Sequence, residues 1–187
     1  MPLIPKLKAY HGSIKRVNFN GVDAARLEPE GSGHLRVHTK ETYHAPIRAS
    51  WSMYTLKDMR PKGTNGSPNL DGLHIHFGHI DNYINYNMHV VRRDKNAKLD
   101  IEHGLRGYQS IKWFGNSGLP LRLWRRYVFT LTWELDRVEV VVSNDNDPID
   151  IGMFEAELPL YGPHSGHIGF RLDNIGVYLS SLAIREL

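Results

Sequence analysis

Short runs of β-branched and aromatic residues, separated by turn-forming residues, recur along almost the whole chain. Apolar and polar residues alternate within many of these runs, as in Leu73-His74-Ile75-His76-Phe77. A period of two is the signature of a strand with one buried face. Amphipathic helical periodicity is hard to find anywhere, so the pattern predicts an all-β protein.

The runs that follow this pattern are bounded by clusters of Gly, Pro, Asn and Asp. The predicted strands are His34 to Thr39, Ile47 to Leu56, Leu73 to His79, Tyr83 to Arg93, Leu99 to His103, Arg126 to Glu134, Arg137 to Ser143, His167 to Asp173 and Val177 to Arg185. The predicted turns are Lys62 to Pro68, Asp94 to Asn96 and Asn144 to Pro148. Short strands at this spacing predict a two-sheet antiparallel β-sandwich.

Length and composition narrow the possibilities further. With 187 residues and no evident linker or repeat, the chain is expected to form one domain, residues 1–187. The absence of cysteine excludes disulfides and thiolate metal sites. A formal charge of +3, with scattered basic residues, is too weak a footprint for nucleic acid.

The start of the chain, MPLIPKLKAY, lacks the apolar segment of a secretory signal. No window reaches the apolar length needed to cross a bilayer. The sequence as given therefore predicts a soluble, cytoplasmic protein with no membrane partner.

Two segments resemble known proteins. Residues 127–149, YVFTLTWELDRVEVVVSNDNDPI, resemble a strand-turn-strand unit of concanavalin A-like glucanases. Residues 166–187, GHIGFRLDNIGVYLSSLAIREL, are similar to the ending of jelly-roll domains in sugar-processing proteins. The resemblance implies a concanavalin A-like jelly roll. It covers about a quarter of the chain and does not specify an activity.

One apparent catalytic motif fails on geometry. Residues 134–139, ELDRVE, spell the E-x-D-x-x-E of retaining glucanases, whose carboxylates project from one face of one strand. The resemblance places Leu135, Asp136 and Arg137 in a turn between two strands. We therefore expect a charged hairpin tip there.

The strand that carries the acids in such enzymes corresponds best to Tyr83 to Arg93. Its alternation places amides and an imidazole on one face, where a glucanase has carboxylates. Applied to the neighbouring strands, the alternation predicts one polar surface, here called the predicted polar face. Its members are Arg48, Tyr54, His74, His76, Asn85, Asn87, His89 and Glu102.

Carbohydrate binding is the leading interpretation of this surface, which is expected to be concave. Amides, carboxylates and imidazoles hydrogen-bond to sugar hydroxyls, and aromatic rings stack on pyranoses. Expected sugar-binding residues are His74, Asn85, Asn87, Glu102, Tyr83 and Trp113, with Tyr108 as a further rim residue. The expected ligand is an oligosaccharide or polysaccharide. Trp51, Trp124 and Trp133 are expected in the core.

Polysaccharide processing is an alternative, by hydrolysis or by eliminative cleavage of a polyuronide. A lyase needs a group that neutralises the uronate, a base and an acid. Arg48 or Asn87 would neutralise the uronate, solvent-facing His76 or His89 would be the base, and Tyr54 would be the acid. The sequence motifs of jelly-roll alginate lyases are not reproduced, and Leu73 to His76 only distantly echoes their Q-I-H.

Three further interpretations stay open. His74, His76 and His89 could hold a divalent metal as in cupins, although the glutamate spaced as in a cupin is missing. No other cofactor is implied. The histidines could instead simply satisfy one another and solvent. Finally, the sandwich could be a non-catalytic structural or assembly domain, which should present a flat apolar patch.

Overall fold

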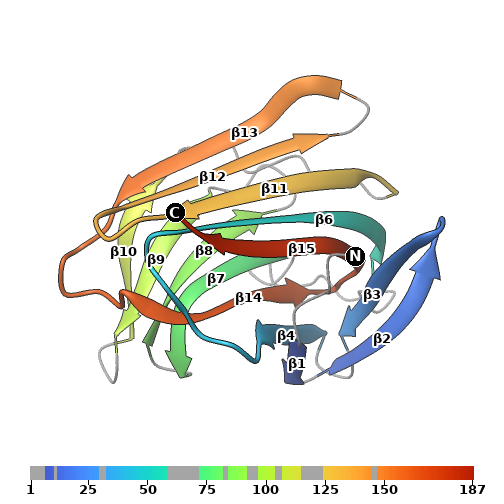
Figure 1. Cartoon of the computed structure of the whole chain (residues 1–187), viewed down its shortest axis with the longest axis horizontal. Helices are drawn as coiled ribbons and strands as arrows, with labels where there is room; N and C mark the ends of the chain where they lie inside the picture. The colour runs from blue at the N-terminus through green and yellow to red at the C-terminus, as the bar shows by residue number, and fades with distance from the viewer. Residues whose placement is uncertain are drawn as a thin grey trace.

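The computed structural model describes residues 7–10, 12–29, 33–58, 72–81, 84–91, 97–103, 107–114, 124–144 and 147–187. These residues form two antiparallel sheets stacked face to face (Figure 1). In the part of the chain so described, no helix is long and apolar enough to span a membrane. The predicted all-β sandwich is confirmed.

Sheet A has eight strands. Its order is β1 (Leu7–Tyr10), β4 (His34–Thr39), β14 (Ser165–Asp173), β7 (Gly72–Asp81), β8 (Ile84–Val91), β9 (Lys98–His103) and β10 (Tyr108–Trp113), with β5 (Tyr43–His44) paired to β14. β14, an inner strand from near the C-terminus, separates β4 from β7. Sheet A is therefore assembled from segments that are distant in sequence.

Sheet B has seven strands and forms the other layer in Figure 1. Its order is β13 (Asp147–Glu157), β12 (Arg137–Asn144), β11 (Arg126–Trp133), β6 (Ile47–Asp58), β15 (Ile175–Glu186), β3 (Val22–Pro29) and β2 (Gly12–Phe19). The two segments that carry the family resemblance supply β11, β12, β15 and the start of β13 in this sheet, and β14 in sheet A.

Aromatic side chains from both sheets meet in the core. Trp51 of β6 stacks on Phe129 of β11, with ring centroids 5.4 Å apart and planes 3° apart. Phe170 of β14 packs against Trp51 from sheet A, and the centroids of the two rings are 5.0 Å apart. Phe77 of β7 meets Trp133 of β11 edge-on at 5.5 Å. These contacts join the apolar faces of the two sheets.

Every predicted strand is present. His34–Thr39 matches the prediction at both ends, and each of the other strands differs from it at one end or at both. The charged hairpin tip is also confirmed, because the Glu134 amide donates to the Arg137 carbonyl at 2.8 Å where β11 turns into β12. Asn144, at the end of β12, pairs with Asp147, at the start of β13, and residues 145–146 of the next predicted turn lie outside the described residues. The predicted turns 62–68 and 94–96 lie outside the described residues.

Strands β1, β2, β3, β5, β10 and β13 were not predicted. β2 and β3 carry charged residues on the strand, as in Lys15-Arg16 and Asp23, so their apolar alternation is weak. β13 begins with Asp147-Pro148, a pair typical of turns. Pairing with neighbouring strands overrides these weak local signals.

Trp133 offers a direct test of the core. Its side chain is fully buried, so Trp133→Ala should lower the free energy of unfolding by about 3–5 kcal/mol. Leu135, in the adjoining hairpin and 51% exposed, is the matched control, and Leu135→Ala should change stability by less than about 0.5 kcal/mol. Urea unfolding measures both. Equal losses in the two variants would contradict this core.

Candidate functional site

The outer face of sheet A carries polar side chains in two rows that cross seven strands. We call this surface the polar face. Its first row, in cross-strand register, is Trp113, Lys98, His89, His74, Arg171, Arg36 and Tyr10. Its second row is Ser110, Asp100, Asn87, His76, Gly169, His38 and Lys8. The alternation that buries Leu73 and Ile75 in the core places His74 and His76 here.

Two buried carboxylates organise the centre of the first row. Asp173 of β14 lies 3.0 Å from Nε2 of His74 and 2.9 Å from Nε of Arg171. Asp100 of β9 lies 3.0 Å from Nε2 of His89 and 2.7 Å from Nζ of Lys98. The two carboxylate side chains are only 2% and 1% exposed. Each therefore depends on its histidine and cation partners.

The two histidines also contact each other and a neighbouring amide. The rings of His74 and His89 lie 4.2 Å apart between centroids. Nδ1 of His74 lies 3.2 Å from the side-chain oxygen of Asn87. Two residues before Asn87 on β8, the side-chain amide of Asn85 donates to the Glu102 carboxylate at 2.9 Å. These contacts hold the rings and amides in fixed orientations.

Three further histidines form a stack at the other end of the face, here called the histidine stack. The His38 and His79 rings lie 3.8 Å apart, and Nε2 of His38 lies 3.1 Å from Nδ1 of His76. Among the described residues, four buried ring nitrogens of the stack have no hydrogen-bond partner: Nδ1 of His38, Nε2 of His76, and both nitrogens of His79.

Gly169 makes room for this stack. It lies between His38 of β4 and His76 of β7 in the second row. A Cβ at this position would overlap Cδ2 of the His38 ring and would come within 2.5 Å of the Val37 carbonyl oxygen. The absent side chain thus lets His38 lie across β14 and reach His76.

Burial keeps these histidines neutral near pH 7. It lowers the pKa of His38 to about 3 and the pKa of His79 to about 4. Burial also lowers the pKa of His89 to about 4, although the contact with Asp100 opposes this change. Burial alone would raise the pKa of Asp100, but hydrogen bonds from His89, Lys98 and Ser110 hold it at about 2.

A cavity of about 450 Å³ opens beside the histidine stack. Its lining includes His38, His79 and His167, together with Lys8 and Tyr10 of β1. One end of the polar face is therefore hollowed, and the hollow is bordered by imidazoles, an ammonium group and a phenol ring.

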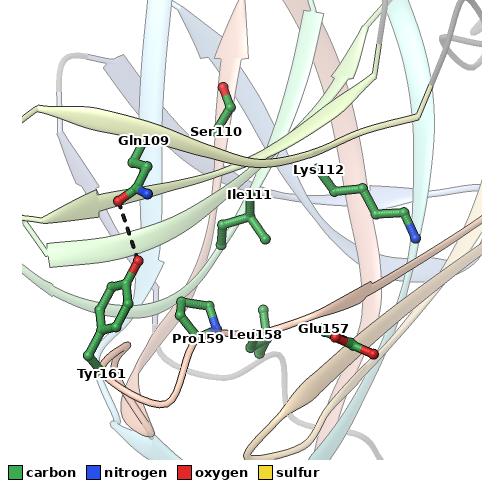
Figure 2. Close-up of a pocket in the computed structure, with 8 residues that line it drawn as sticks. All are labelled: Gln109, Ser110, Ile111, Lys112, Glu157, Leu158, Pro159 and Tyr161. Carbon is green, nitrogen blue, oxygen red and sulfur yellow. Dashed lines mark hydrogen bonds between the residues drawn. The ribbon is translucent and has the colours of Figure 1, made fainter.

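A larger cavity of about 530 Å³ lies between β10 and the chain that follows β13 (Figure 2). Ile111 and Leu158 face each other near its centre, and Tyr161 donates to Gln109 across one end at 3.3 Å. Ser110 points away from this cavity and donates to Asp100. None of the predicted site residues lines it, so its position does not favour it as the main site.

Six members of the predicted polar face do share one surface: His74, His76, Asn85, Asn87, His89 and Glu102. Trp113 is 58% exposed at the end of the first row, with the Lys98 ammonium 5.4 Å from its ring centroid. Tyr83 lies outside the described residues. The backbone of Tyr108 pairs with Glu102, but its side chain also lies outside the description.

The placement of Arg48 and Tyr54 on this surface is wrong. Both belong to β6, which pairs with β11 and β15 in sheet B. They lie in the opposite layer because sheet membership depends on long-range pairing, which alternation within β6 does not reveal.

Three predicted exposures are also wrong. His76 is buried, at 3% exposure, because other polar side chains surround it on the face. His89 is partly buried, with a side chain 21% exposed. Trp124 is 58% exposed, although the expectation placed it in the core with Trp51 and Trp133. It precedes β11 and lies on no alternating strand.

Several residues of the polar face were not predicted as site residues. The strand His34 to Thr39 is predicted, but the pairing with β14 that brings Arg36 and His38 onto the polar face is long-range. Arg171 and Asp173 are alternate residues of the predicted strand His167 to Asp173, and this spacing predicts a solvated ion pair. The ion pair is present, but Asp173 is buried against His74, so it belongs to the network.

The metal interpretation gains no support from this geometry. Among the described residues, no group of three or more His, Cys, Asp or Glu side chains could hold a metal ion. His74 and His89 are instead directed at Asp173 and Asp100.

Gly169→Ala should lower the free energy of unfolding by about 1–3 kcal/mol, because the methyl group overlaps His38. A double-mutant cycle with His38→Ala should show a coupling of at least about 0.5 kcal/mol, since removing the ring relieves the overlap. Thermal or urea unfolding of the four proteins measures it. Strict additivity would contradict the close approach of the ring.

Acidification should destabilise the protein below about pH 6.5. The unfolded histidines take up protons near their ordinary value of 6.5, whereas folded His38, His79 and His89 do so only near 3 to 4. Between these two pH values, each of these histidines is protonated only in the unfolded chain. Each therefore lowers the free energy of unfolding by about 1.4 kcal/mol for every pH unit of acidification. Urea unfolding from pH 7 to pH 5 measures this slope.

His89→Gln should reduce the slope of unfolding free energy against pH by the contribution of one histidine. His44→Gln is the control, because His44 is exposed and lies outside the polar face. Stability that rises on acidification from pH 7 to pH 5 would rule out buried neutral histidines.

Known structures share this arrangement of strands. The carbohydrate-binding module CBM66 from Bacillus subtilis is similar over 100% of this chain and 99% of its own, with a TM-score of 0.68 and 10% identity. The lectin UEA-II complexed with galactose is similar over 100% and 95%, with a TM-score of 0.62 and 11% identity. The exoplasmic/lumenal domain of VIP36, in its Ca2+/Man3GlcNAc-bound form, is similar over 97% and 86%, with a TM-score of 0.61 and 8% identity.

No protein-family model matches the sequence, and no curated protein matches it. At these low identities the structural similarity concerns the fold alone. The chain has the concanavalin A-like jelly-roll fold that its sequence resembles.

Proposed function

We propose that the protein binds a carbohydrate chain across the polar face. One observation carries this proposal: the first row places the partly exposed His89 imidazole and Arg171 guanidinium, beside the buried ring of His74, between two exposed aromatic side chains. Trp113 of β10 stands at one end and is 58% exposed, and Tyr10 of β1 stands at the other and is 40% exposed. Sugars are bound by this combination, because hydroxyls need hydrogen-bonding partners and the faces of pyranose rings are apolar.

The dimensions of the row favour a chain over a single sugar. Six strand spacings separate β10 from β1. At about 4.8 Å per spacing, the row is about 29 Å long. Affinity should therefore increase with oligosaccharide length until the ligand reaches that span.

The internal contacts of the polar face favour binding by a prearranged surface. Asp173 and Asp100 hold His74 and His89 in place before any ligand arrives. A site whose side chains are already ordered loses less conformational entropy on binding. The cavity beside the histidine stack would accommodate one sugar unit at the end of the chain.

The names of the similar structures support the same conclusion. One is a carbohydrate-binding module, another is a lectin complexed with galactose, and a third was determined with Man3GlcNAc bound. These ligands belong to those proteins. They support a sugar ligand here, and the identity of the sugar is left to the binding experiment.

The geometry favours binding over cleavage. Arg48, one of the two candidate neutralising groups of a lyase, and Tyr54, its candidate acid, lie in sheet B, whereas the other neutralising candidate, Asn87, lies on the polar face. Burial lowers the pKa of His76 well below its ordinary value, whereas an efficient general base has a pKa near the working pH. The hydrolase and lyase alternatives therefore have less support than non-catalytic binding.

The assembly alternative is also less favoured. The exposed large apolar side chains of the described residues are spread over different strands of both sheets, for example Tyr10 on β1, Trp113 on β10 and Met153 on β13. An assembly domain would instead present them as one continuous patch.

Loss of either end of the row should weaken binding. A glycan array with the whole chain identifies an oligosaccharide, and calorimetry then measures its affinity for each variant. Trp113→Ala and Tyr10→Ala should each weaken binding by roughly tenfold, equivalent to about 1.4 kcal/mol of lost stacking. Leu160→Ala is the control, because Leu160 is exposed but lies outside the polar face.

No binding to any glycan would contradict the proposal. So would a glycan whose affinity is unchanged in both Trp113→Ala and Tyr10→Ala. Unsaturated uronide products, detected by ultraviolet absorbance during incubation, would restore the lyase alternative.

A further inference from the structure

The outer face of sheet B has a separate hollow of about 280 Å³, on the opposite side of the sandwich from the polar face. Its lining combines aromatic rings with hydrogen-bonding groups. The residues used below are Phe19, Ser52, Tyr54, Trp124, Arg126 and Tyr178. We call this hollow the aromatic pocket. It includes Tyr54, a member of the predicted polar face.

Three rings form one wall of the aromatic pocket. Tyr54 of β6 and Tyr178 of β15 are direct cross-strand partners. Phe19, at the end of β2, packs against both, with centroids 4.2 Å from the Tyr178 ring and 5.0 Å from the Tyr54 ring. The wall is therefore built by three strands and does not depend on a single side chain.

Polar groups lie beside these rings. Arg126 is the cross-strand partner of Tyr54 on the other side of β6. Its guanidinium donates to the Ser52 hydroxyl at 3.1 Å, which orients the planar group next to the wall. The pocket thus offers stacking surfaces and hydrogen-bonding groups side by side.

Trp124 stands at this pocket in a strained conformation. Its φ is 60°, in the left-handed region that residues other than Gly, Asn and Asp rarely adopt. Two hydrogen bonds hold the turn: the Trp124 amide donates to the Thr55 carbonyl at 2.8 Å, and the Arg125 amide donates to the Thr55 hydroxyl at 3.2 Å. This conformation leaves an indole ring 58% exposed.

Neither core packing nor turn chemistry accounts for this residue. Asn20, which also lines the pocket with positive φ, is followed by Gly21 with positive φ, and Asn-Gly is the pair that a tight β-hairpin turn prefers. Tryptophan has no such preference. Backbone strain that presents an exposed aromatic ring beside a hollow is typical of a ligand-binding position.

We infer that the aromatic pocket is a second carbohydrate-binding site, which takes a single pyranose unit. The apolar face of the sugar ring would stack on Trp124, and its hydroxyls would bond to Arg126 and Tyr54. Aromatic rings beside a guanidinium and hydroxyls favour a sugar over a purely apolar partner. The inference does not rest on the polar face, because no residue is shared between the two surfaces.

Fluorescence can isolate this pocket. Trp113 and Trp124 are exposed, whereas Trp51 and Trp133 are buried, so Trp113→Phe leaves Trp124 as the exposed indole. The probes are the methyl pyranosides of glucose, galactose and mannose at millimolar concentrations. At least one should change the emission of Trp113→Phe in a saturable way, and the change should be absent in the double variant Trp113→Phe/Trp124→Phe.

Trp124→Gly provides the second measurement. Glycine adopts this φ without strain, so the variant should have an unchanged or higher melting temperature. Its affinity for the same pyranoside, measured by calorimetry, should fall at least tenfold. Leu160→Ala is the matched control and should leave this affinity unchanged, because Leu160 is exposed and lies on neither surface.

Three results would overturn the inference. The first is that no pyranoside changes the fluorescence emission of Trp124. The second is that Trp124→Gly binds the pyranoside with unchanged affinity. The third is that sedimentation shows a dimer, which Trp124→Gly converts to a monomer. The last would make the pocket a contact between two copies of the chain. Because Tyr10 and Trp113 report on the other face, failure here is distinguishable from failure of the polar face.

Discussion

The strand register of this protein depends on aromatic packing between the two sheets. Trp51 of sheet B packs against Phe129 in its own sheet and against Phe170 of sheet A, so each of these strands must direct its apolar residues inward. A shift of one residue in any of these strands would exchange its two faces. The same contacts that bury the core therefore determine which polar residues reach the outer surfaces.

On sheet A this constraint produces an ordered polar surface. Asp173 and Asp100 are buried beneath their partners, and each joins a histidine to a cation. Burial keeps His89 neutral, so its ring can both donate and accept hydrogen bonds near pH 7. Sheet B presents a different surface, with stacked rings and an exposed indole. The two faces thus suit a long polar ligand and a single sugar ring, respectively.

The sequence predicts features that depend on local alternation. It identified β7, β8 and β9 and placed His74, Asn87 and His89 on one face, because a strand exposes every second residue. It failed where pairing is long-range. Tyr54 lies in sheet B because β6 pairs with β11 and β15, and Asp173 reaches His74 because β14 inserts beside β7. Alternation within one strand contains neither fact.

The central claim is the location of the ligand on the polar face. The most direct measurement is a nuclear magnetic resonance titration of the isotope-labelled protein with the oligosaccharide selected on the array. The account predicts that backbone amide shifts concentrate on β4, β14, β7, β8 and β9 and extend to Trp113 and Tyr10. Shifts confined to sheet B, or to the cavity between β10 and the chain after β13, would contradict it.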